Sequence, residues 1–262
     1  MKQTFLTILA ISALAVPFSG KAVNIMPDYS TVPAGWTTDR YEPTSFSNVG
    51  SFAGRSDVLG IEITSAGNLL NRPAAYQSSF YNTQGRQHAL IGGSGSSIAA
   101  DLYIPSSWSD PSQGSIRSDM WGVMTDGAAV TSYPILGFTT YGGASRFRYW
   151  DNAGGSWVDL AASVNYDGWN SLSIDFTGTT FEYYINGSLV GTDGAIGGGT
   201  TGFQAVIMQA YNFADPAISG AVNVDYTAHW SNTQSVPDAG STLALMGVAC
   251  ASIAGLRRKF NA

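Results

Sequence analysis

Polar and apolar residues alternate along much of the chain between residues 23 and 230, and no helical period of 3.6 residues is evident there. In segment 221–230, for example, Val222, Val224, Tyr226, Ala228 and Trp230 fall on one face, and a polar residue separates each from the next. Successive side chains of a strand point to opposite faces of a sheet. The alternation therefore predicts strands with one buried face and an all-β body.

Further segments extend this interpretation. The same alternation occurs over residues 98–104, 146–149 and 171–176, whereas residues 203–211 are nearly all apolar apart from Gln204 and Gln209. A continuous apolar run of this kind predicts a central strand covered on both faces. The 12% aromatic content excludes a disordered chain, and 262 residues are consistent with a single sandwich domain.

The most specific local signal is Asn186-Gly187 between two apolar segments. Both central positions of a type I′ turn need positive φ, so this dipeptide predicts a two-residue hairpin. A second hairpin is expected through Thr177-Gly178-Thr179-Thr180, which joins residues 169–176 to 181–185. Together they predict a three-stranded meander.

The meander resembles those of laminin-G and concanavalin-like jelly rolls. The residues that carry the resemblance are Trp169, Leu172, Ile174, Gly178, Tyr183, Asn186, Gly187, Leu189 and Val190. The resemblance implies a jelly-roll β-sandwich of two antiparallel sheets, one of them often concave. Relatives use the concave face or the rim loops for glycans, proteins or calcium, and some are glycosidases or lyases.

The N-terminus has the three parts of a secretory signal peptide. Lys2 precedes an apolar core over residues 5–18, and Gly20 and Ala22 lie three residues and one residue before the predicted cleavage point. Cleavage is expected after Ala22, with Ala15 as the second choice.

The C-terminus carries a short motif, an uncharged segment and a basic cluster. The uncharged segment, residues 242–256, would span about 22 Å as a helix, which is short of the roughly 30 Å bilayer core. The motif is Val236, Pro237, Asp238, Ala239 and Gly240, and the basic cluster, expected to stay cytoplasmic, is Arg257, Arg258 and Lys259.

This tail resembles the sorting signals of the PEP-CTERM class, in the variant whose signature is Val-Pro-Asp-Ser-Gly. Ala239 stands where that variant usually has Ser. The resemblance implies a Gram-negative host whose membrane exosortase processes the tail and releases or re-anchors the body. The expected organisation is a signal peptide (1–22), a β-sandwich (23–230), a linker (231–235) and the sorting signal (236–262).

The charge and the cysteine content exclude several kinds of partner and site. Residues 23–235 contain seven arginines, no lysine and seventeen acidic residues, so no basic footprint for nucleic acid exists. Cys250 is the single cysteine of the chain, which excludes an internal disulfide and a thiolate metal site.

The residues needed for hydrolysis are sparse. Glycosidases of this fold class present acidic side chains at alternate positions of one strand, whereas Glu42, Glu62 and Glu182 are isolated here. His88 and His229 lie far apart in sequence, and the body has no lysine for a lyase set. We expect no enzymatic activity. A divergent polysaccharide hydrolase or lyase is the alternative.

Binding is the preferred interpretation. Sugars stack on flat aromatic side chains, and the candidates here are Trp36, Trp108, Tyr149, Trp150 and Trp157. No cofactor is expected. A structural calcium ion stays open as an alternative at the loops of Asp110, Asp119, Asp126, Asp151, Asp167 and Asp193.

The sequence therefore predicts an exported surface or extracellular-matrix protein that is glycan-binding, adhesive or structural. Its partners would be the secretion machinery, an exosortase and extracellular polysaccharide, with the inner membrane holding it transiently through the C-terminal segment.

Overall fold

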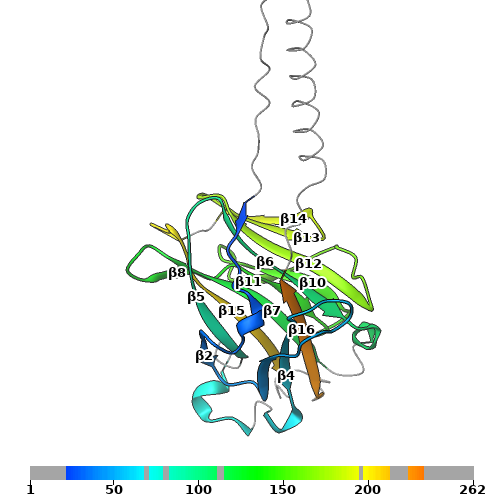
Figure 1. The fold of residues 1–262 in the computed structure, drawn as a ribbon. Coiled ribbons are helices and arrows are strands. Elements are labelled where there is room, and N and C mark those ends of the chain that lie inside the picture. The colour runs from blue at the N-terminus through cyan, green and yellow to red at the C-terminus, as the bar shows by residue number, and fades with distance from the viewer. Residues whose placement is uncertain are drawn as a thin grey trace, which may run out of the picture.

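A computed structural model describes residues 22–67, 71–78, 83–110, 115–194, 197–212 and 224–232 (Figure 1). Within these ranges, strands dominate, and the helical elements are single turns of 3-10 helix. These turns are η1 (Tyr29–Thr31), η2 (Ser65–Gly67), η4 (Ala74–Tyr76) and η5 (Ser106–Ser109).

The first sheet of the described chain has eight strands, in the order β14-β13-β12-β6-β16-β4-β3, with β1 paired in parallel to β6. Its other pairs are antiparallel. Its strands are β1 (Val23–Asn24), β3 (Ser45–Asn48), β4 (Leu59–Ile63), β6 (Ser96–Ile104), β12 (Gly168–Phe176), β13 (Phe181–Ile185), β14 (Ser188–Asp193) and β16 (Tyr226–Asn232).

The second sheet also has eight strands among the described residues, in the order β11-β10-β9-β7-β15-β5-β2, with β8 paired to β7. Its pairs are all antiparallel. Its strands are β2 (Trp36–Arg40), β5 (Gln84–Gly92), β7 (Ile116–Thr125), β8 (Val130–Ser132), β9 (Ile135–Thr139), β10 (Arg146–Asp151), β11 (Ser156–Asp159) and β15 (Gly202–Asn212).

The core lies between the two sheets and follows the alternation in the sequence. On β12, Leu172, Ile174 and Phe176 are at most 1% exposed, whereas Ser171 and Ser173 are half-buried on the other face. The prediction for residues 203–211 is also confirmed, because β15 lies between β7 and β5 and is buried on both faces. The β-sandwich of two antiparallel sheets expected from the sequence is the architecture observed.

The predicted meander forms as β12, β13 and β14. Asn186 and Gly187 have φ of +50° and +78°, as a type I′ turn requires, and Gly178 has φ of +99° in the preceding turn. The Asn186 side chain accepts a hydrogen bond from the Ser171 amide at 2.8 Å, which ties the turn back to β12.

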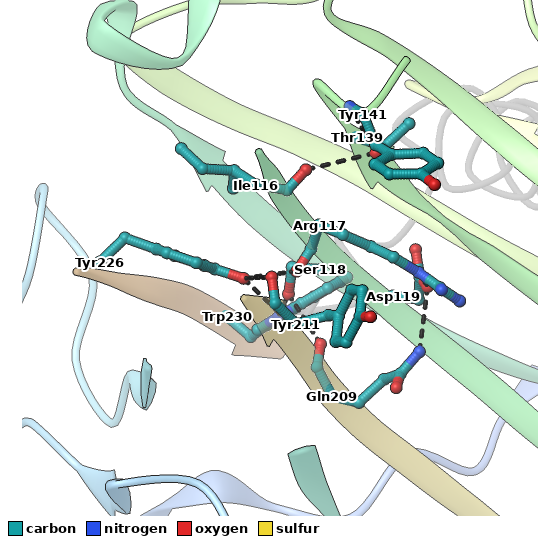
Figure 2. A network of polar contacts seen from close by, with 10 residues as sticks. All are labelled: Ile116, Arg117, Ser118, Asp119, Thr139, Tyr141, Gln209, Tyr211, Tyr226 and Trp230. Atoms are coloured by element: carbon teal, nitrogen blue, oxygen red, sulfur yellow. Dashed lines mark hydrogen bonds and ion pairs between the residues drawn. The ribbon is translucent and has the colours of Figure 1, made fainter. Parts of the chain in front are cut away.

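Two aromatic side chains of β16 connect the sheets (Figure 2). Trp230 donates from Nε1 to Ser118 Oγ on β7 at 2.9 Å. The Tyr226 hydroxyl accepts from the Tyr211 amide at 2.9 Å, and its proton is directed at the carbonyl oxygens of Arg117 and Tyr211. These contacts hold β7 and β15 at a fixed position above β16.

The first and last strands of the described body, β1 and β16, both pair with the same strand, β6. Val23 pairs with Ser96 and donates its amide to the Gly95 carbonyl at 2.8 Å, while Asn232 pairs with Ala100. The Asn232 side chain also donates from Nδ2 to the Pro27 carbonyl at 3.0 Å. Both ends therefore leave the sandwich at one end (Figure 1).

The boundaries differ slightly from those expected. Strand β16 continues to Asn232, two residues into the predicted linker 231–235, because these residues still pair with β6. The signal peptide (apart from Ala22) and the C-terminal segment 236–262 lie outside the described residues. Within the described residues, no helix is long and apolar enough to span a bilayer.

Candidate functional site

A row of residues crosses the outer face of the second sheet at right angles to its strands. Each member is the cross-strand partner of the next, so the row takes one residue from each of the strands β2, β5, β15, β7, β9, β10 and β11. We call it the polar row. Its members in that order are Asp39, Gly85, Gln209, Asp119, Gly137, Arg148 and Asp159.

Asp119 lies at the centre of the polar row and is fully buried. Its Oδ2 is ion-paired with Arg117 Nε and accepts from Gln209 Nε2 at 3.0 Å. Its Oδ1 and the Gln209 Oε1 are buried without a hydrogen-bond partner. Figure 2 shows Arg117, Asp119 and Gln209 on the side of β7 and β15 opposite to Tyr226 and Trp230.

Gly137 makes room for the Asp119 carboxylate. A Cβ at this position would lie 2.7 Å from Asp119 Cα and still closer to Asp119 Oδ1 and to the Ser118 carbonyl oxygen. The carboxylate therefore occupies the space that any larger residue on β9 would fill.

Arg148 is the cation of the polar row. It is 4% exposed, and its guanidinium carbon lies 3.8 Å from the centre of the Trp157 ring. The guanidinium of Arg117 lies over the same ring at 4.6 Å. Burial, and then the neighbouring charge of Arg117, lower the pKa of Arg148 to about 9, so it is still charged at neutral pH.

An apolar row runs beside the polar row on the same face. Trp121 of β7 pairs with Ile135 of β9 and Ile207 of β15, and Trp150 of β10 pairs with Trp157 of β11. The Trp150 and Trp157 rings meet edge to face, with centroids 5.4 Å apart, and both are half-buried. These residues form a hydrophobic cluster separate from the main core. We call the two rows together the outer platform.

Two predicted stacking residues lie in the core instead. Trp36 is 5% exposed and packs against Phe46 at 5.1 Å, and Trp108 is 4% exposed and packs against Phe138 at 5.8 Å. No ring face is left for a sugar, so the prediction is wrong for Trp36 and Trp108. The half-buried ring of Tyr149 stacks on Tyr183 at 4.4 Å. Only Trp150 and Trp157 come together on the outer platform.

From the sequence, Asp119 stood out only as a possible calcium ligand and Gln209 only as a polar residue in an apolar run, and Arg117 did not stand out. Gln209 interrupts an apolar strand, and Arg117, Asp119 and Trp121 alternate along β7, which is the signal that could have found them. Their neighbours on β9, β10 and β15 become known only from the pairing of strands distant in sequence.

Two of the six acidic side chains considered as calcium ligands cap turns, whereas Asp119 lies buried in β7. Asp126 Oδ1 accepts from the Ala128 and Ala129 amides, and Asp151 Oδ1 accepts from the Ala153 and Gly154 amides. Asp167 accepts from the Ser106 amide. Across the described segments, no group of three or more His, Cys, Asp or Glu side chains is placed to hold a metal ion.

The two histidines belong to different sheets. His88 lies on β5 against Trp36, whereas His229 lies on the outer face of the first sheet, stacked on Phe52 with ring centroids 3.8 Å apart. Burial lowers the pKa of His229. They cannot act together on one substrate.

This depressed pKa makes stability depend on pH. Protonation of His229 is easier in the unfolded chain than in the folded chain, so it favours unfolding. The contribution of neutral His229 to the unfolding free energy is therefore complete above about pH 6.5 and is lost as pH falls through the folded-state pKa. We expect wild type to lose more unfolding free energy between pH 7 and pH 5 than His229→Gln. Urea denaturation at both pH values measures this, and equal losses would contradict it.

The comparisons with known proteins divide between the tail and the fold. The family described as the VPDSG-CTERM motif matches residues 235–260. The chain carries a VPDSG-CTERM motif. This motif implies an exported, exosortase-sorted cell-surface protein. No curated protein matches this chain.

Solved structures resemble the body of this chain. A β-glucanase of Bacillus licheniformis is 13% identical, with TM-score 0.47, over 81% of this chain and 96% of that chain. A pseudo β-1,3-glucanase of Mycobacterium tuberculosis is 12% identical, with TM-score 0.47, over 81% and 98%. A carbohydrate-binding module of Bacillus subtilis is 12% identical, with TM-score 0.37, over 80% and 95%. These are similarities of fold.

Proposed function

We propose that this protein is an exported surface protein that binds extracellular polysaccharide on the outer platform without hydrolysing it. The observation that carries the proposal is the juxtaposition of two half-buried tryptophans with the buried polar side chains of Gln209, Asp119 and Arg148 on one sheet face. Glycan sites combine flat aromatic surfaces with a few oriented polar groups.

The polar row has unused hydrogen-bonding capacity. Asp119 Oδ1, Gln209 Oε1 and Arg148 Nε are each buried without a partner. Leaving such a group unsatisfied costs about 1–3 kcal/mol, so a sugar hydroxyl, or a water that accompanies it, is favoured here. The guanidinium groups of Arg117 and Arg148, which lie over the Trp157 ring, add hydrogen-bond donors to this part of the platform.

The positions of the carboxylates favour binding over catalysis. Glycosidases use two carboxyl groups about 5–9.5 Å apart. Asp119 and Asp159 are separated by three strand spacings, about 14 Å between their backbones, and each is ion-paired with an arginine. Neither is placed to share one glycosidic bond with the other.

A matched pair of tryptophan variants tests the proposal. In affinity electrophoresis and calorimetry with mixed-linkage β-glucan, xylan and polygalacturonate, at least one polysaccharide should bind, and Trp150→Ala should weaken that binding at least tenfold, about 1.4 kcal/mol. Trp169→Ala is the control, since Trp169 is half-buried on the outer face of the opposite sheet. It should bind like wild type.

The opposite results are equally clear. An equal loss of polysaccharide affinity in Trp150→Ala and Trp169→Ala would show that the binding site is not on the outer platform. Release of reducing sugar by wild type, abolished in Asp119→Asn, would establish the hydrolase alternative instead.

A further inference from the structure

The arginines of the body differ in whether a carboxylate neutralises them. Five of the seven in the described chain form ion pairs, namely Arg40, Arg55, Arg86, Arg117 and Arg146. Arg72 donates to the Gly67 carbonyl and to Gln84. Among the described residues, Arg148 has neither a carboxylate within ion-pair distance nor a hydrogen-bond acceptor, although it is 4% exposed.

The carboxylates near Arg148 are already engaged. Asp119 pairs with Arg117 through Oδ2, and Asp159 pairs with Arg146 at 2.7 Å. Three guanidinium groups therefore face two carboxylates on this part of the outer platform, which leaves one positive charge in excess. Burying a cation without a counterion is costly, and a ligand that brings an anion would remove that cost.

The planar shape of the Arg148 guanidinium limits which kinds of anion it can bind well. A guanidinium presents parallel N–H donors that match a carboxylate or a sulfate, and Arg148 is held flat against Trp157. Of its three nitrogens, only Nε is fully buried without an acceptor, so the terminal pair is the part a ligand can reach. Trp150 lies beside it to pack against the apolar face of a sugar ring.

We propose that the glycan bound on the outer platform is anionic and that Arg148 receives its acidic group. This inference rests on the proposed glycan-binding function and specifies its ligand class. The body as a whole carries about ten negative charges, seventeen acidic residues against seven arginines, so it repels a long polyanion. Recognition is therefore local, and at 0.15 M salt the repulsion is screened beyond about 8 Å.

Short oligosaccharides make the test sharp. The exported protein is titrated calorimetrically at 0.15 M salt with trigalacturonate, with its carboxyl-reduced counterpart of identical linkage, and with a sulfated trisaccharide. Wild type should bind at least one anionic ligand ten times more tightly than the neutral ligand. Whichever of the two anionic ligands binds more tightly shows whether Arg148 receives a carboxylate or a sulfate.

The variants assign the effect to Arg148. Arg148→Gln should bind the anionic ligand at least ten times more weakly than wild type and the neutral ligand with nearly the same affinity. Arg148→Lys should retain part of the preference for the anionic ligand. Arg55→Gln is the matched control, because Arg55 lies over Trp169, 4.5 Å from the ring centre, on the opposite sheet and pairs with Asp101. It should keep the wild-type preference.

The outcomes separate the two proposals. Equal affinity of wild type for the neutral and anionic ligands would overturn the inference and leave polysaccharide binding intact. No binding of these ligands or of the polysaccharides named above would overturn both. The wild-type comparison needs no variant, so it decides the question even if Arg148→Gln does not fold.

Discussion

Replacing Pro237 and Asp238 with alanine should leave the full-length chain in the inner membrane of a host with the matching exosortase. The motif-bearing tail implies sorting by that enzyme. Pro237 has no amide donor and disfavours helix at Val236, so the sequence favours an extended peptide that an enzyme can bind as a strand. Residues 242–256 are too few for a permanent anchor, which suits a segment held only until it is processed.

Fractionation followed by immunoblotting measures the retention, which should be nearly complete. Thr233→Ala with Gln234→Ala is the control, since it changes two neighbouring residues outside the motif. Wild-type peptides that span residues 238–256, recovered by mass spectrometry from mature surface protein, would show that the tail is an ordinary anchor.

Trp230→Ala should be the most destabilising single change in the body, with a loss of about 3–5 kcal/mol. The side chain is fully buried between the sheets, and its Nε1 donates to Ser118 Oγ at 2.9 Å. The variant loses the packing of the ring and one of the contacts that join β16 to β7. Because domains are typically stable by about 5–15 kcal/mol, a large share of the protein would unfold.

Urea denaturation of the two tryptophan variants in the first sheet provides the comparison. Trp169→Ala should lose less than half as much unfolding free energy as Trp230→Ala, because the Trp169 ring is half-buried on the outer face of the sheet. Trp230→Phe keeps most of the volume and removes the N–H donor, so it should fall between them. A loss below about 1 kcal/mol in Trp230→Ala would mean that the sheets are not joined at this point.

The fold was largely predictable because its determinants are local. Alternation specifies which face of β12 is buried, and Asn186-Gly187 specifies a turn that needs two positive φ angles. Trp108 shows the limit of that reasoning. It lies in a polar segment, yet η5 turns its ring inward against Phe138 and Tyr226, a contact between residues distant in sequence.

The outer platform was only half predictable for the same reason. Trp150 and Trp157 lie on adjacent strands with a short connection, and the sequence suggested both as sugar contacts. Asp119, Gly137 and Gln209 meet because β7 pairs with β9 on one side and β15 on the other. No local pattern specifies which strand becomes a neighbour, so neither the unpartnered atoms nor the excess charge could be foreseen.

The position of β16 also determines how the body withstands a pull. Force applied through the C-terminal segment enters the described body at Asn232 and is directed along β16. This strand is bonded to β6 on one side and to β4 on the other, by bonds that run perpendicular to it. Extraction would therefore load both ladders in shear and would have to drag Tyr226 and Trp230 out of the space between the sheets. A body held by its C-terminal end is thus loaded at a mechanically strong point.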